Sequence, residues 1–109
     1  MASGTIKKHM AQRDVLSSTV TENTLVINGD YRAYDQIEIF GYDGTNSGGH
    51  RFFIVIPKIA FEKGDVNTIY CPVNGNNPAL ALINVSSTGI TIKLQNTGRY
   101  VSDVVGVKY

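Results

Sequence analysis

The stretch 43-DGTNSGGHR-51 concentrates the side chains of this sequence that are best suited to chemistry. It brings an aspartate, an asparagine, a histidine and an arginine close together, directly after a tyrosine. Carboxylate, amide, imidazole and guanidinium groups can pair with sugar hydroxyls, and an aromatic ring can cover the apolar side of a pyranose. The candidate ligand-binding residues are therefore Tyr42, Asp43, Asn46, His50 and Arg51.

The same stretch is a poor candidate for catalysis. His50 is the only credible general base, and Ser47 lies in a glycine-rich loop rather than on a strained strand-to-helix elbow. Asp43 could meet His50 across the loop, but a turn aspartate more often caps its own backbone. With two histidines and one cysteine in the chain, a zinc site is not expected. We predict no enzymatic activity, no catalytic residue, no metal and no cofactor.

Bulk composition narrows the classes of partner. The net charge of +1 gives no electrostatic reason to bind nucleic acid or an anionic membrane. No window approaches the roughly 18 consecutive apolar residues of a membrane-spanning helix, so membrane insertion is not expected either. Cys71 precedes Pro72 after an apolar run, which favours a small buried hydrophobe over a nucleophile.

A chain of 109 residues is the size of one domain. The pair His9-Met10 is typical of a cloning junction, so residues 1–10 are either partly vector-derived or an ordinary flexible terminus. Residues 11–109 are expected to form a single domain.

Residue preference indicates an all-β fold. The sequence has 11 valines and 11 isoleucines against 5 leucines, and β-branched side chains favour strands over helices. Short apolar runs alternate with glycine-rich turns, as in antiparallel sandwiches and barrels. The expected strands are 14–20, 24–27, 34–42, 51–57, 67–73, 79–85, 90–95 and 100–109, with 58–65 irregular or a short edge strand.

Alternation predicts which faces are buried. In 90-ITIKLQ-95 the isoleucines and the leucine should point inward and the polar side chains outward, and in 34–42 Ile37 and Ile39 should share the inner face. Residues 52–57 and 79–83 are apolar on both faces. Either they are central strands of a monomer or their second face is buried on the axis of a trimer.

Two segments carry a resemblance to a known family. The ending 100-YVSDVVGVKY-109 is similar to the C-terminal close of bacteriophage tail-fibre and tail-needle tip domains, and 34-YDQIEIFGYDGTNSGGHRFFIVIPK-58 resembles the strand–loop–strand of those tips. The resemblance covers about a third of the chain. It implies an antiparallel β-sandwich, a jelly-roll-like knob, that assembles as a homotrimer at the end of a fibre on the virion. The implied partner is a glycan, lipopolysaccharide or protein on the bacterial surface.

Three other functions are left open by the sequence. The domain could be a purely structural trimerisation cap, a free-standing monomeric carbohydrate-binding module, or an enzyme whose activity depends on His50. The loop 43–51 could also be only a long turn, although hairpins usually need about two to five residues. The resemblance transfers no functional residue, because those tips share no binding motif.

Overall fold

The computed structural model describes residues 11–43, 50–62, 68–72, 80–95 and 98–109. These residues form strands and turns with one short 3-10 helix at Lys58–Ala60, which confirms the all-β prediction. The strands are β1 (Gln12–Ser17), β2 (Thr21–Glu22), β3 (Thr24–Asn28), β4 (Gln36–Asp43), β5 (His50–Pro57), β6 (Thr68–Pro72), β7 (Leu80–Val85), β8 (Gly89–Leu94) and β9 (Arg99–Lys108).

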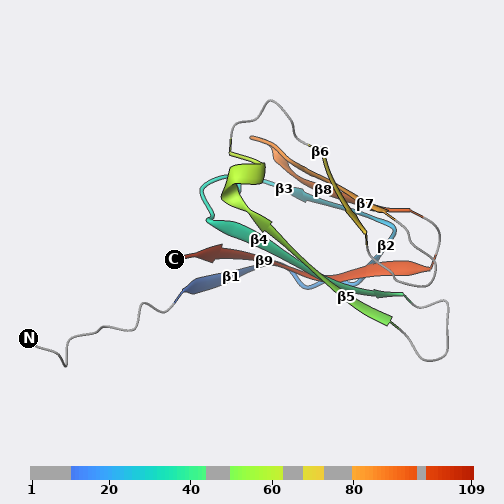
Figure 1. The fold of residues 1–109 in the computed structure, drawn as a ribbon. Helices are drawn as coiled ribbons and strands as arrows, with labels where there is room; N and C mark the ends of the chain where they lie inside the picture. Colours follow the sequence, from blue (N-terminus) through green and yellow to red (C-terminus); the bar gives the residue numbers. More distant parts are fainter. Residues whose placement is uncertain (1–10, 44–49, 63–67, 73–79, 96–97) are drawn as a thin grey trace, which may run out of the picture.

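The strands form two antiparallel sheets, which lie one above the other in Figure 1. Sheet A has the order β1-β9-β4-β5, with β2 also pairing with β9. Sheet B has the order β3-β8-β7-β6. This arrangement is compatible with the predicted β-sandwich.

Period-2 alternation builds the core between the sheets. In β8 the side chains of Ile90, Ile92 and Leu94 are buried while Lys93 is exposed, as the sequence predicts. In β4 Ile37 and Ile39 are likewise fully buried, which confirms their shared inner face. Facing positions of the other strands, together with Phe61 after the 3-10 helix, complete one apolar cluster. The strand residues are Leu25, Ile27, Ile54, Ile56, Ala81, Ile83, Val85, Val101 and Val104.

The chain crosses from sheet A to sheet B at Asn23, between β2 and β3. Asn23 has a φ of 62°, in the left-handed region that asparagine enters more readily than most residues. Its N–H donates to the Arg99 carbonyl (2.9 Å), and its own carbonyl accepts from the Leu94 N–H (2.7 Å). Because Arg99 begins β9 and Leu94 ends β8, this one residue is hydrogen-bonded to both sheets.

Strand β5 departs from its predicted place. Its apolar sequence predicted a central strand covered on both sides, but β5 is the edge strand of sheet A and pairs with β4 alone among the described strands. Ile54 and Ile56 point into the core, whereas Phe53 and Val55 remain 55% and 43% exposed. The central-strand alternative was therefore wrong for β5, whose second face is left open to solvent by the described part of the chain. Burial of that face on a trimer axis stays a prediction.

The two ends of sheet A carry different features. Gln12 of β1 pairs with Lys108 of β9, so the start of β1 and the C-terminus share one end. Asp43 pairs with Arg99, which places the β4–β5 hairpin at the other end (Figure 1). Ten residues of β9 at about 3.4 Å each separate these ends by roughly 30 Å.

The C-terminal end is held by contacts that involve Tyr34 and Asp35. The Tyr109 N–H donates to the Asp35 carboxylate (2.7 Å), and the Tyr34 hydroxyl donates to Asp14 Oδ2 on β1 (2.6 Å). That bond, together with those from Gln12, lowers the pKa of Asp14 below its ordinary value. The same bond and burial raise the pKa of Tyr34 to about 12.

We expect Tyr34→Phe to remove a pH-dependent part of the stability. The raised pKa of Tyr34 stabilises the fold at pH values below 10, the ordinary pKa of tyrosine. This stabilisation is lost as the pH rises towards about 12. The lowered pKa of Asp14 stabilises the fold at pH values above 3.8, its ordinary pKa. This stabilisation is lost as the pH falls through the lowered pKa. The variant should unfold more easily at neutral pH and lose less stability at both extremes, as measured by urea titration across pH.

Tyr31→Phe is the matched control, because Tyr31 lies at the same end and its hydroxyl donates to the Asn28 carbonyl instead (2.7 Å). That variant should keep the alkaline loss seen in the parent. Identical pH profiles for the parent and Tyr34→Phe would contradict the assignment.

Candidate functional site

The predicted ligand-binding residues lie on the β4–β5 hairpin. The register pairs Tyr42 with Arg51 and Asp43 with His50 across its two strands. For Asp43 and His50 the backbone is described but the side chains are not, and Asn46 lies outside the described residues. The structure therefore brings Tyr42 and Arg51 together as cross-strand neighbours and does not test the other three.

Tyr42 belongs to an aromatic pair on the outward face of sheet A. Its register partner on the other side is Tyr100 of β9, and the two rings stack with centroids 5.0 Å apart and planes 18° apart. Both side chains are partly exposed. Offset stacking of this kind holds both rings in place without a polar contact.

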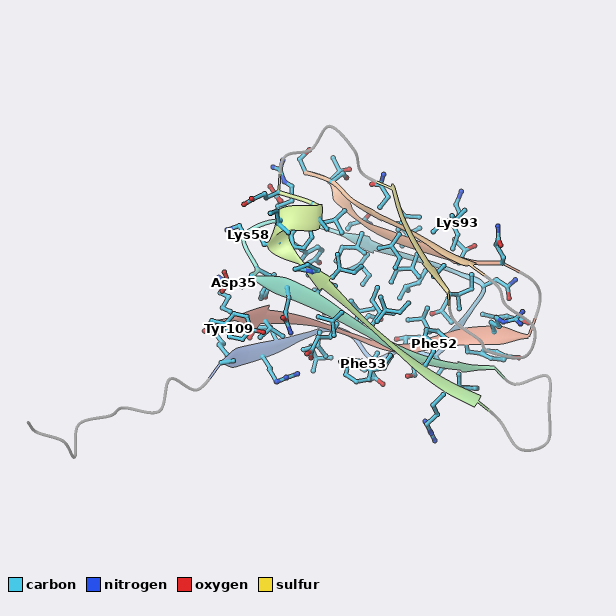
Figure 2. The ribbon with its side chains drawn as sticks, viewed as in Figure 1. Asp35, Phe52, Phe53, Lys58, Lys93 and Tyr109 are labelled. Atoms are coloured by element: carbon cyan, nitrogen blue, oxygen red, sulfur yellow. The ribbon has the colours of Figure 1, made fainter. Side chains whose placement is uncertain are left out.

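A second aromatic pair lies in the neighbouring row of the same face. Phe40 of β4 faces Phe53 of β5 across the register, and their ring centroids are 4.7 Å apart. Phe53 projects from the side of sheet A that faces away from sheet B (Figure 2).

A groove of about 360 Å³ opens beside these rings. Its volume lies at the lower limit of known ligand sites, which are about 300–1,000 Å³. It combines an exposed guanidinium, a carboxylate, a hydroxyl and aromatic rings. The lining residues are Phe40, Gly41, Arg51, Phe52, Phe53, Ser102 and Asp103.

A β-bulge in β9 supplies the polar side of this groove. Phe40 pairs with Asp103 and Gly41 pairs with Val101, so Ser102 is the extra residue. The Ser102 hydroxyl donates to the Phe40 carbonyl (3.2 Å). The bulge thus brings a hydroxyl and a carboxylate to the same groove, next to the aromatic residues of β4 and β5.

Gly41 leaves room for this packing. A Cβ at this position would collide with the ring of Phe52 and with the backbone carbonyl of Tyr100. The ring is partly buried against the core, and the carbonyl is fixed in the sheet. Glycine therefore lets Phe52 lie across β4 beside the groove.

The sequence prediction missed the β9 side of the site. Of the predicted residues, Arg51 lines the groove and adjoins a long polar loop, whereas Ser102 and Asp103 lie within an apolar strand far along the chain. The break of alternation at 102-SD-103 was the available signal, since a bulge interrupts the period of two.

The remaining loop tyrosines lie elsewhere. Tyr31 and Tyr34 stack on each other, 6.5 Å between centroids, near the C-terminal end of the sheet. Tyr34 also lies under the Lys108 ammonium, 5.2 Å from its ring centroid. These two rings therefore belong to the end opposite the hairpin and are separate from the groove.

Sheet B has a second, simpler depression of about 330 Å³ on its outward face. It is lined by Leu82, Asn84, Thr91 and Lys93, and Lys93 points away from sheet A in Figure 2. The lining side chains that the structure describes here are one cation, one amide, one hydroxyl and one aliphatic group.

Within residues 11–43, 50–62, 68–72, 80–95 and 98–109, no three His, Cys, Asp or Glu side chains converge as metal ligands would. In the same ranges no helix has the length and hydropathy needed to cross a membrane.

No family model matches this chain, and comparisons with curated proteins and with solved structures likewise found no significant match. The resemblance to phage tips therefore depends on segments 34–58 and 100–109 alone.

We expect Gly41→Ala to lower the free energy of unfolding by about 1–3 kcal/mol, the usual cost of forcing an extra carbon into a packed site. The Tyr100 carbonyl cannot move away without disturbing the β4–β9 pairing. Urea denaturation of the parent and the variant measures the difference. Thr24→Ala, at an exposed position of β3, is the control and should cost less than about 1 kcal/mol. Equal stability of Gly41→Ala and the parent would contradict the tight fit.

Proposed function

We propose that this protein is an attachment domain that binds a glycan of a bacterial surface in the groove beside the β4–β5 hairpin. The observation that carries the proposal is the groove itself, in which Arg51, Ser102 and Asp103 lie beside the exposed ring of Phe53 and the partly exposed ring of Phe40. Guanidinium, hydroxyl and carboxylate groups complement sugar hydroxyls, and aromatic faces complement the C–H side of a sugar ring.

The position of the groove supports attachment rather than a site enclosed within the domain. Its β9 residues, Ser102 and Asp103, lie five to six residues from Lys108, beside which β1 starts, a distance of roughly 17–20 Å along the strand. A domain carried through residues that precede β1 would present the hairpin away from its support. This is the arrangement that a receptor-binding tip requires.

The resemblance of segments 34–58 and 100–109 suggests the biological setting. On that ground we infer a jelly-roll-like, homotrimeric knob at the end of a bacteriophage tail fibre, which acts outside the cell as part of the virion. Its partner is then a surface glycan, lipopolysaccharide or outer-membrane protein, and the role is binding without catalysis.

A structural trimerisation cap is the second candidate. It is favoured by the exposed apolar side chains of sheet A, of which Val15 and Phe53 are 66% and 55% exposed. A cap would form trimers and bind no host component, whereas a free-standing carbohydrate-binding module would bind glycans as a monomer.

We expect Arg51→Ala to weaken glycan binding about tenfold to a hundredfold, because a charge-assisted hydrogen bond contributes roughly 1.5–3 kcal/mol. The probe is an array of bacterial lipopolysaccharides and capsular polysaccharides, followed by titration of the strongest binder. Lys93→Ala is the matched control, since Lys93 is an exposed cation beside the depression of sheet B. Its affinity should equal that of the parent.

A second variant tests the hairpin loop by replacing 44-GTNSGG-49 with Asn-Gly, a tight two-residue turn. Folding should persist and binding should fall. If no glycan on the array binds the parent, or if both Arg51→Ala and the shortened loop bind like the parent, the proposed site is wrong.

A further inference from the structure

The outward face of sheet A has an apolar centre next to the groove. In the register, Val15, Val105, Glu38 and Val55 form one row across β1, β9, β4 and β5. The next row brings Phe40 beside Phe53. Val15, Phe53 and Val55 are 66%, 55% and 43% exposed, so large hydrophobic side chains on both sides of Glu38 meet solvent.

The single carboxylate in this row is already neutralised within the chain. Glu38 is only 3% exposed, and its carboxylate pairs with the guanidinium of Arg13. Gln36 Nε2 also donates to Glu38 Oε2 (3.0 Å). Both carboxylate oxygens of Glu38 have partners. Covering this face would therefore not bury an unpaired charge, which would cost free energy.

The size of the face fits a protein partner. Four strands about 4.8 Å apart and eight residues at about 3.4 Å each give a footprint on the order of 500 Å². The accessible area is larger, because side chains stand out from the sheet. A standard interface buries about 800 Å² per partner, so a face of this size is of the right order for one.

Charge balance favours a second copy of this chain over other partners. On this face Arg13 is paired with Glu38, and the groove adds one cation and one anion, Arg51 and Asp103. These four charges sum to zero, so two identical faces do not repel each other through them. The chain as a whole carries +1. A nucleic acid or an anionic membrane would instead select a strongly cationic face.

The edge of sheet A points to the same partner. Strand β5 pairs only with β4 among the described strands, and its central stretch 52-FFIVI-56 contains no charge and no proline, between Arg51 and Pro57 at its two ends. Apolar edges of this kind pair with other chains unless lysine, proline or a bulge blocks them. The exposed face and the unblocked edge meet at Phe53 and Val55.

We propose that the outward face of sheet A, centred on Val15 and Val55, is the surface against which a second copy of the chain packs. The proposal deepens the assembly inferred above, because it assigns the contact between copies to one sheet. It does not depend on the identity of the glycan.

The test replaces two exposed valines of this face with lysine, Val15→Lys together with Val55→Lys, and compares Val26→Lys. Val26 is 58% exposed on the outward face of sheet B, so it matches the pair in residue type and exposure but not in place. Light scattering after size exclusion measures the mass at micromolar concentration. The parent and Val26→Lys should have the mass of two or more copies, and the double variant the 11.9 kDa of one chain.

A monomeric parent would overturn the proposal, as would an unchanged mass for the double variant or dissociation by Val26→Lys. If the double lysine variant does not fold, as judged by circular dichroism, Val55→Thr takes its place, because threonine keeps the shape and strand preference of valine. It should weaken association at least about tenfold by burying a hydroxyl without a partner. An unchanged association constant would count against the face.

Glycan binding separates this proposal from the function proposed above. A monomeric parent that binds glycan, with Arg51→Ala impaired, leaves the attachment site standing and removes the interface. If the parent is an oligomer and the double lysine variant is a monomer, but the parent binds no glycan, the interface stands and the attachment site is wrong. If the parent is a monomer and Val55→Thr loses glycan binding, the face binds the glycan, and the proposed contact between copies is wrong.

Discussion

The pairing of β9 on both of its edges is the constraint on which the rest of the molecule depends. Buried backbone N–H and C=O groups need partners, and β9 is the longest strand, with fully buried valines at 101, 104 and 107. One edge is satisfied by β4 along its length, and the other by β1 and β2 in turn. This pairing determines three other features of the fold: the separation of β1 from β2, the corner at Asn23 and the position of the β4–β5 hairpin.

Much of the fold could be predicted because its strands obey a period of two. The alternation of 90-ITIKLQ-95 and 34–42 correctly assigned Ile90, Ile92, Ile37 and Ile39 to the core. Pro57 ends β5 as predicted, because proline cannot continue the ladder. The segment after it was left undecided between irregular chain and edge strand, and it forms a 3-10 helix followed by the buried Phe61.

Other features depend on contacts between distant parts of the chain. The run 52–57 is apolar on both faces, but sequence alone does not say whether the chain itself covers the second face. The candidate site was found only in part for the same kind of reason. Arg51 and Tyr42 adjoin a conspicuous loop, whereas Asp103 reaches the groove through a bulge that is defined only against its partner Phe40.

The opposite placement of the start of β1 and the hairpin has a mechanical consequence. A pull between Gln12 and a ligand held in the groove runs roughly along the strands of sheet A. The hydrogen bonds between β1 and β9 then lie across the direction of force and carry it together, in shear. Peeling would load them one after another, so this geometry suits a domain that must remain folded while it bears tension.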